Sequence, residues 1–402
     1  MTSSFSLPAE FPPPPEGRRP DLLVVAGEHS GDQHAAVAVR KLLERNPGLT
    51  VVALGGAALR DTRATFLYDM TRSSVVGVFE VIRHFGFFRE LFGKILDWIE
   101  RYRPRAVCFV DNPGLNLRLC KALHRRGLSV QGGGDIRLLY YIAPQVWAWK
   151  GKRRFSMARH LDALAVIFPF EVESFADTDL EVTFVGHPYL AEDFRPLVRY
   201  DPEGTILLLP GSRRIAVGRI LPALLGGFAR LLEEKPNERA TVITPDDEVR
   251  ALAECELESR PNLKDRVTFA DKDDTVRGKA VLTSSGTMSL TCALAGIPGA
   301  IVYRVGRVTY WLGRVLITIP YLGIANLLLK KPMYPEYLQE RASPRNLAAE
   351  LRDCLESPAR LEATHCDTAH LRARLAAPGR ETVDRWLEKR VIAEKNDGGQ
   401  TP

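Results

Sequence analysis

Residues 21–32 read DLLVVAGEHSGD, and this stretch decides the fold class. The apolar run at 21–26 is typical of a buried β-strand, and Gly27 follows it directly. The sequence then continues in a helical pattern through about Glu44. A strand, a glycine-bearing turn and a helix in this order predict the opening unit of an α/β domain with a parallel sheet.

The same alternation recurs along the 402-residue chain. We expect strands at 50–54, 106–110, 138–142, 163–167 and 181–185, and again at 205–209, 240–244, 267–270, 280–283 and 300–303. This pattern indicates two parallel sheets with helices on both faces. The predicted fold is therefore α/β, with two facing Rossmann-like doubly wound domains and a ligand-binding cleft between them.

The predicted organisation has four parts. Residues 1–20 are rich in proline and are expected to form a disordered tail. An N-terminal domain with a membrane-facing helix is predicted at 21–190 and a C-terminal domain at 200–355, and 356–402 should hold C-terminal helices and a frayed tail. We predict no membrane-spanning helix, because the apolar stretches are short or rich in Ser, Thr and Gly.

Net charge indicates the class of partner, and cysteine usage indicates the redox compartment. The chain has 55 lysines and arginines against 49 aspartates and glutamates, a formal net charge of +6. Phosphate, anionic lipid or nucleic acid would suit this charge, and nucleic acid is the least favoured because no nucleic-acid fold signature occurs. The six cysteines lie far apart without a CxxC pair, which predicts reduced thiols in a cytosolic protein and no zinc or redox site.

Two polar motifs follow strands in the first half. In AGEHSGD, 26–32, glycines would let a ligand approach the helix N-terminus, although an ordinary turn with Ser30 or Asp32 as N-cap explains them too. In DNPGLN, 111–116, an Asp at a strand end suits a general base toward a hydroxyl. The alternative for Asp111 is an Asx turn that caps the next helix.

Two small-residue loops follow strands in the second half. LPGSR, 209–213, and SSGT, 284–287, place small residues where backbone amides are free. Two such loops at equivalent strand ends favour a nucleotide diphosphate, with Arg213 adding charge and fork geometry. A plain helix N-cap is the alternative for Ser284–Thr287.

Two apolar stretches leave core packing and membrane contact both open. In Val75–Tyr102 a helical stripe of aromatic and aliphatic residues is flanked by basic ones, and Arg304–Lys331 has a similar composition. A third stretch, YYIAPQVWAWK at 140–150, carries two tryptophans at a strand end, either packed under the cleft or forming its floor.

Nine segments in this order resemble the lipid-A-disaccharide synthase family of GT-B glycosyltransferases. They span about residues 22–355, and APQVWAWK is the most distinctive of them. The matching segments are AGEHSGD (26–32), VVGVFEV (75–81), VDNPGLN (110–116), YYIAPQVWAWKGKR (140–153), IFPFE (167–171), FVGHP (184–188), LLPGSR (208–213), SSGT (284–287) and PEYLQ (335–339).

This resemblance implies a GT-B fold and an inverting, metal-independent and cofactor-free transfer. The donor would be UDP-2,3-diacylglucosamine and the acceptor 2,3-diacylglucosamine 1-phosphate (lipid X), attacking through its 6-hydroxyl. UDP and lipid A disaccharide 1-phosphate would result. The resemblance also implies a cytoplasmic protein, peripheral on the inner face of the inner membrane, and it is compatible with a homodimer.

The resemblance also implies which residues form the site. Asp111 would be the general base, with Glu28 and Asp32 as further catalytic residues. The implied substrate-binding residues are Ser30, Gly31, Glu80, Asn116, Trp147, Gly211, Ser212, Arg213, Ser285, Gly286, Thr287, Asn326 and Gln339.

The donor half departs from the family pattern. Thr291 stands where the family usually has a Glu that suits a ribose diol, and residues 214–219 lack the usual acidic side chains. A hydroxyl in place of that carboxylate would lose roughly 1–3 kcal/mol. Two alternatives therefore stay open: a non-catalytic or weakly active lipid-binding relative, and another UDP-sugar-dependent GT-B enzyme such as a cell-wall transferase or an epimerase.

Overall fold

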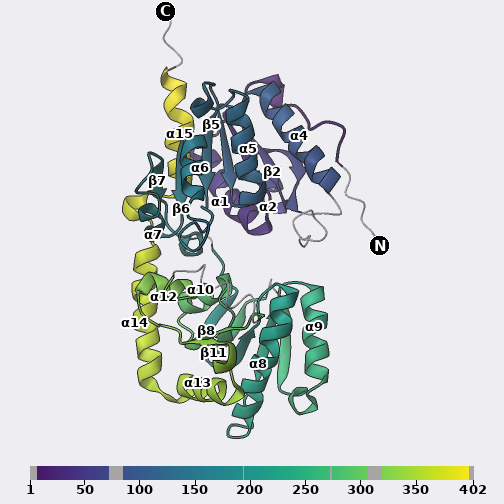
Figure 1. Cartoon of the computed structure of the whole chain (residues 1–402), viewed down its shortest axis with the longest axis vertical. Helices are drawn as coiled ribbons and strands as arrows, with labels where there is room; N and C mark the ends of the chain where they lie inside the picture. Colours follow the sequence, from purple (N-terminus) through teal and green to yellow (C-terminus); the bar gives the residue numbers. More distant parts are fainter. Residues whose placement is uncertain (1–6, 72–84, 193, 272–273, 307–318, 398–402) are drawn as a thin grey trace, which may run out of the picture. The chain divides into compact units, whose positions relative to one another are not determined.

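The computed structural model describes residues 7–71, 85–192, 194–271, 274–306 and 319–397. The chain divides into two compact units: unit 1 comprises 1–188 and 377–402, and unit 2 comprises 189–376 (Figure 1). The structure defines each unit by itself, so the predicted cleft between them stays a prediction.

Unit 1 is built on a seven-stranded parallel sheet in the order β3-β2-β1-β4-β5-β6-β7. Six of its strands fall where the sequence predicts them, and β3 was not predicted because its residues are only half-buried and lack a continuous apolar run. The strands are β1 (Leu22–Ala26), β2 (Val51–Gly55), β3 (Thr65–Asp69), β4 (Ala106–Val110), β5 (Arg137–Tyr141), β6 (Ala163–Val166) and β7 (Glu181–Phe184).

Helices cover both faces of this sheet, as predicted. Side chains alternate along each strand, so Leu23 and Val25 join one core while Leu22 and Val24 join the other. The first core is closed by α4 (Phe85–Tyr102), α5 (Pro113–Arg125) and α6 (Arg153–His160), with α7 (Pro169–Glu173) following β6. The second is closed by α1 (His29–Arg45), α2 (Ala57–Arg60) and α15 (Val383–Asp397).

The N-terminal segment packs against α4. Phe11 is only 5% exposed and belongs to the core beneath α4. The Trp98 indole donates to the Pro12 carbonyl at 2.9 Å, and Lys94 donates to the carbonyls of Pro8 and Ala9. The predicted disordered tail is therefore wrong for residues 7–20, because extended proline-rich backbone offers carbonyls that α4 side chains can bind.

The C-terminal segment 356–402 is divided between the units. Helix α14 (Pro358–Leu375) belongs to unit 2, whereas α15 belongs to unit 1. Trp386 on α15 is fully buried in the unit 1 core, and Arg45 pairs with Asp384 at 2.6 Å and with Glu388 at 3.1 Å. The last helix is thus an integral part of the first unit.

Unit 2 carries a six-stranded parallel sheet in the order β10-β9-β8-β11-β12-β13. β8 begins seven residues before the predicted strand at 205, and β13, a three-residue edge strand, was not predicted. The strands are β8 (Val198–Leu209), β9 (Ala240–Thr244), β10 (Val267–Asp271), β11 (Val276–Thr283), β12 (Gly299–Tyr303) and β13 (Glu336–Leu338).

The helices of unit 2 form two groups. The main core is closed by α8 (Arg214–Leu232), α9 (Asp247–Glu258) and α13 (Pro344–Glu356), while α10 (Thr287–Leu294), α12 (Ile324–Leu329) and α14 pack against one another outside that core. By length and composition alone α8 could cross a membrane, but its apolar residues from Val217 to Leu231 form the centre of the unit 2 core. Their burial accounts for the composition of α8.

Each sheet reverses its strand order near the middle. In unit 1 the chain runs outward from β1 through β2 to β3, and β4 then pairs with the other side of β1. In unit 2 β8 and β11 stand in the same relation. Loops at the carboxyl ends of such strand pairs are where doubly wound sheets bind ligands. The four predicted motifs occupy these positions.

Candidate functional site

The two motifs of unit 1 adjoin at the point between β1 and β4. A Cβ at Gly27 would lie 2.5 Å from the Asn112 amide nitrogen. A Cβ at Gly31 would lie 3.7 Å from the Asp111 Cβ and 3.5 Å from the Val110 carbonyl oxygen. Glycine at 27 thus lets the backbone of the AGEHSGD loop lie directly against the DNPGLN loop.

The backbone of Asp111 is fixed in an unusual conformation. Asp111 and Asn112 both have positive φ, 48° and 43°, which L-residues adopt at a cost of about 1–3 kcal/mol each. The Tyr140 hydroxyl donates to the Asp111 carbonyl at 2.5 Å, and the Asn116 amide donates to it at 2.8 Å. Buried donors from two elements therefore hold the loop that presents the Asp111 carboxyl group.

The Asp111 carboxyl group is a suitable proton acceptor. It is half-buried, and burial raises its pKa, while the Asn112 backbone N–H acts in the opposite direction. A carboxylate with a raised pKa binds a proton more strongly, which makes it a better general base than one free in water.

Two predicted site residues near Asp111 have structural roles instead. Asp32 is fully buried, and its carboxylate accepts the N–H groups of Gly56 at 2.7 Å, Ala58 at 2.9 Å and Leu59 at 3.2 Å, at the start of α2. Both oxygens serve the backbone, which favours a structural role for Asp32 over the predicted catalytic one. Asn116 is also fully buried, and its amide holds the Asp111 carbonyl, which favours a positioning role over the predicted substrate contact.

The rest of the first loop is more accessible. Glu28 is half-buried and is the N-cap residue of α1, although its side chain does not cap the helix. Ser30 is exposed in the first turn, and Gly31 is buried beside the DNPGLN loop. The alternative that Ser30 or Asp32 caps α1 is therefore wrong.

A carboxylate that the site prediction missed holds the tryptophan loop. The Trp147 indole donates to Glu171 at 3.3 Å, and the other oxygen of Glu171 accepts the N–H groups of Ile167 and Phe168. Burial raises the pKa of Glu171 to about 8. Trp147 is half-buried and packs edge-on against Phe170, so Glu171 links the loops after β5 and β6. Its signal was the IFPFE segment after a predicted strand.

The two small-residue loops of unit 2 also meet. Gly211 has φ of +100°, and a Cβ there would lie 3.0 Å from the Ser284 hydroxyl. The Ser284 N–H donates to the Leu209 carbonyl at 2.8 Å. This adjacency follows the prediction of two loops at equivalent strand ends.

These loops open the helices α8 and α10. The N-cap residues Arg213 and Gly286 make no side-chain cap, so the first-turn N–H groups of both helices lack that partner. Ser212, Arg213, Gly286 and Thr287 are exposed, and Ser285 is half-buried. Free amides at two helix N-termini beside an exposed guanidinium form an arrangement suited to an anion.

The remaining predicted contacts lie elsewhere. Asn326 is fully buried, donates to Tyr334 and Glu336 and accepts the Tyr334 N–H, which favours a structural role over the predicted substrate contact. Gln339 exchanges two hydrogen bonds of 3.0 Å with the Val305 backbone, which occupies both ends of its amide. Glu80 lies outside the described residues.

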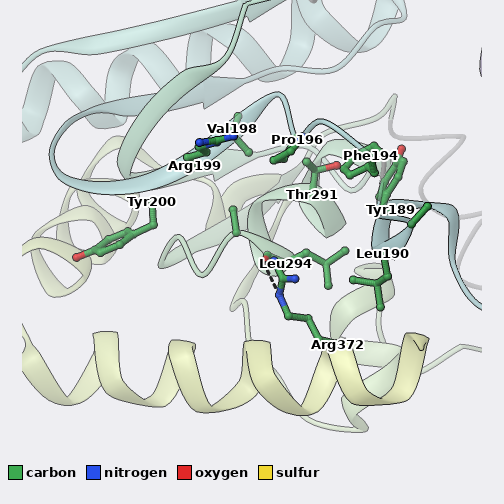
Figure 2. A pocket seen from close by; sticks show the side chains of 12 residues that line it. Tyr189, Leu190, Phe194, Pro196, Val198, Arg199, Tyr200, Thr291, Leu294 and Arg372 are labelled. Atoms are coloured by element: carbon green, nitrogen blue, oxygen red, sulfur yellow. Dashed lines mark hydrogen bonds between the residues drawn. The ribbon is translucent and has the colours of Figure 1, made fainter. Parts of the chain in front are cut away.

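Thr291 borders a pocket of about 390 Å³ within unit 2 (Figure 2). It is 4% exposed and hydrogen-bonds to Tyr189, whose ring stacks on Phe194 with centroids 4.6 Å apart. Figure 2 shows these three residues at one end of the pocket and Tyr200 at the other. Position 291, where the resemblance leads us to expect a Glu, is therefore covered by Tyr189.

The described part of the apolar stretch 75–102 belongs to the core. On α4, Leu91, Ile95 and Ile99 are no more than 1% exposed. The core alternative is thus confirmed for this helix. Residues 75–84, and 307–318 of the second stretch, lie outside the described residues.

Comparisons with known proteins agree with this architecture. A family model described as Lipid-A-disaccharide synthetase matches residues 22–389. The lipid-A-disaccharide synthase of Geobacter sulfurreducens is 33% identical over 376 residues, 89% of this chain and 94% of that protein. Lipid-A-disaccharide synthase 1 of Legionella pneumophila strain Lens is 33% identical over 397 residues, 93% of this chain and 97% of that protein.

Solved structures of similar fold are more distant in sequence. A putative UDP-N-acetylglucosamine 2-epimerase from Listeria monocytogenes has a TM-score of 0.59 at 14% identity, covering 95% of this chain and 97% of that one. The calicheamicin glycosyltransferase CalG4 has a TM-score of 0.52 at 13% identity, covering 96% and 100%. This likeness concerns the fold alone and confirms the predicted GT-B class.

Proposed function

The chain belongs to the lipid-A-disaccharide synthase family, and from this premise we propose that it joins two acylated glucosamines. It is a hexosyltransferase of lipid A biosynthesis that uses UDP-2,3-diacylglucosamine as donor and 2,3-diacylglucosamine 1-phosphate as acceptor. The observation that carries the proposal is the family match over 22–389, which includes both strand-order reversals and all four loops that flank them.

Unit 2 would hold the donor. Its diphosphate would accept hydrogen bonds from the free amides at the starts of α8 and α10, with Arg213 adding a bidentate charge. These groups stabilise the negative charge that develops on the departing β-phosphate oxygen. Ribose recognition would come from groups other than position 291, because Thr291 is buried against Tyr189.

Unit 1 would activate the acceptor. The 6-hydroxyl oxygen attacks the anomeric carbon of the donor, and its proton passes to the Asp111 carboxylate. The bond from the anomeric carbon to the β-phosphate oxygen breaks, and UDP leaves with the electron pair. Attack opposite the leaving group inverts the anomeric centre. The fixed loop and the raised pKa of Asp111 support this role.

We place the protein in the cytoplasm and at the inner face of the inner membrane, where acylated glucosamines would reside. A homodimer remains a prediction that analytical ultracentrifugation would test, since a sedimentation coefficient of a 44.8 kDa particle would contradict it.

The direct test is product formation in detergent micelles with purified protein. Asp111→Asn should lower kcat about 10²–10⁴-fold, because an amide cannot take the proton. Asp97→Asn is the matched control, since Asp97 is an exposed carboxylate on α4. A rate unchanged in Asp111→Asn would exclude the base assignment, and no disaccharide from the unmodified protein would exclude the proposed function.

A further inference from the structure

The outer surface of α5 and α6 is strongly basic. Residues 113–160 contain ten arginines and lysines and a single carboxylate, Asp135. On α5, Arg118, Lys121 and Arg125 recur at intervals of three and four, and all three are exposed. Residues with this spacing lie on one side of a helix. The helix therefore turns a row of cations outward.

A second row follows on α6. Lys152, Phe155 and Arg159 also recur at intervals of three and four, and all three are exposed. The inward residues Met157 and His160 are buried, which fixes the outward direction of this row. We call these six residues, three on α5 and three on α6 counting its N-cap residue Lys152, the basic face.

The two rows belong to one surface. Helices α5 and α6 lie side by side on unit 1 (Figure 1), and the rings of His124 and His160 meet edge-on with centroids 4.9 Å apart. Lys121 and Arg159 both lower the pKa of His160 through their charge, so both cations lie near this contact. Arg159 adjoins His160 in sequence, which brings the second row next to the first.

The cations of the basic face have no carboxylate partner within salt-bridge distance among the described residues. The ion pairs of α5 and α6 involve other cations: Arg126, the C-cap residue of α5, pairs with Asp97 and Glu100 of α4, and Arg154 of α6 pairs with Asp177. Asp177, which follows α7, is therefore already engaged by Arg154. The charge of the face is left for a partner outside the chain.

Large apolar side chains stand beside these cations. Among the described residues only five large apolar side chains are exposed, and Trp149 at 51% and Phe155 at 45% are two of them. Lys150 and Arg153 lie over the Trp149 ring, 4.4 Å and 5.8 Å from its centre. Aromatic rings surrounded by lysine and arginine are characteristic of protein surfaces that sit at a bilayer interface.

We propose that the basic face, with Trp149 beside it, binds the surface of an anionic phospholipid bilayer. The cations face the lipid phosphates, and the rings of Trp149 and Phe155 enter the headgroup region. This inference rests on the proposed function only in that acylated substrates reside in a bilayer. It places a membrane contact of unit 1 on α5 and α6, in addition to the apolar stretch 75–102, for which the sequence left core packing and membrane contact both open.

Vesicle sedimentation tests this surface without any substrate. The full chain is mixed with vesicles of phosphatidylcholine alone, or with one third phosphatidylglycerol, at low salt. We expect binding to the anionic vesicles only, and loss of binding in 1 M salt, where charges are screened within about 3 Å. Each cation near an anionic surface contributes about a fivefold factor, so Lys121→Glu/Lys152→Glu should weaken binding at least about 25-fold.

Matched variants separate this surface from net charge and from folding. Lys264→Glu/Arg345→Glu changes the same charge at exposed positions of unit 2 and should bind vesicles as the unmodified protein does. Phe155→Ser should weaken vesicle binding, but the variant should still prefer anionic over neutral vesicles at low salt. Circular dichroism melts check that the unit 1 variants stay folded.

Several outcomes would overturn the inference. One is equal binding to neutral and anionic vesicles. Another is an equal loss of vesicle binding in the two double variants. The third is binding of a single-stranded oligonucleotide without binding of vesicles. Disaccharide formation from micellar substrates is measured in parallel. Lys121→Glu/Lys152→Glu should retain that activity, so a failure of the surface and a failure of the proposed function give different results.

Discussion

The two strand-order reversals of this protein present opposite kinds of site. In unit 1 the site centres on one half-buried carboxylate, Asp111, held by buried side-chain donors from Asn116 and Tyr140. In unit 2 it consists of exposed small residues and helix-terminal N–H groups beside Arg213. Moving one proton requires one oriented group, whereas holding a diphosphate requires many donors spread over its oxygens. We therefore expect substitution of a buried hydrogen-bonded side chain of unit 1 to reduce stability, and substitution of the exposed Arg213 of unit 2 to reduce affinity for the diphosphate.

Asp32→Asn should cause the largest loss of stability and so test the comparison most strongly. The new amide group would face three N–H donors at the start of α2 in a fully buried place, so the free energy of unfolding should fall by about 3 kcal/mol. Urea denaturation of both variants measures this loss. Asp111→Asn is the contrast and should change stability by less than about 1 kcal/mol. Equal losses would remove the distinction between the two aspartates.

Acid should destabilise unit 1 before unit 2. Burial lowers the pKa of His187 to about 3 and of His34 to about 4, while the unfolded chain binds these protons near pH 6.5. Stability from these neutral histidines is present above pH 6.5 and is lost as pH falls toward 4, on the order of a few kcal/mol. Glu171 has a pKa raised to about 8, so its protonation adds stability as pH falls from 8 to 4.5 and opposes the effect of the histidines.

The difference in free energy of unfolding between the unmodified protein and His187→Gln isolates the contribution of this histidine. This difference in stability should shrink as pH falls from 7 to 4. Denaturant unfolding measures it, followed by the signal of the tryptophans, which include Trp386 of unit 1. A pH-independent difference would contradict the assignment.

The affinity of unit 2 should depend on Arg213. Arg213→Ala removes a charged hydrogen-bond donor and should weaken UDP binding by about 1.5–3 kcal/mol, roughly 10–150-fold. Calorimetry with UDP measures it. The adjacent Arg214→Ala serves as control, because Arg214 is exposed and pairs with Glu248 at 3.3 Å. If both variants lost the same affinity, a general charge effect would explain the result.

A smaller effect is expected from Gly211→Ala. The φ of +100° disfavours any side chain, and the new Cβ would press on Ser284 at 3.0 Å, so stability should fall by about 1–2 kcal/mol and UDP affinity with it. Gly286→Ala is matched, with a negative φ of −83° and no atom closer than 3.9 Å to its Cβ. A larger loss in Gly286→Ala would contradict the role assigned to the Gly211 turn.

Prediction from sequence was strongest where a local pattern suffices. The strands at 22–26, 106–110 and 163–166 are continuous apolar runs, so the residues themselves predict their burial on both faces. The edge strands β3 and β13 were missed because half-exposed residues leave no such run. The tail at 7–20 was misjudged because its order depends on α4, which is distant in sequence.

The hydrogen-bond partners of several predicted site residues could not be read from the sequence for a related reason. Asp32, Asn116 and Asn326 are polar residues in loop motifs, and the sequence alone does not distinguish a side chain that faces a ligand from one that serves buried backbone. Glu171 was missed because its partner, Trp147, lies 24 residues away along the chain. Only the packed structure assigns each of these groups its hydrogen bonds.

By itself the sequence determined two parallel α/β sheets, the four loops at their carboxyl edges and the family, because each depends on residues close together along the chain. The tertiary structure decided which polar side chains of those loops stay accessible, and that α4 turns inward while α5 and α6 turn their cations outward. Burial and partnership are set by contacts between distant segments, and these exist only once the chain has folded.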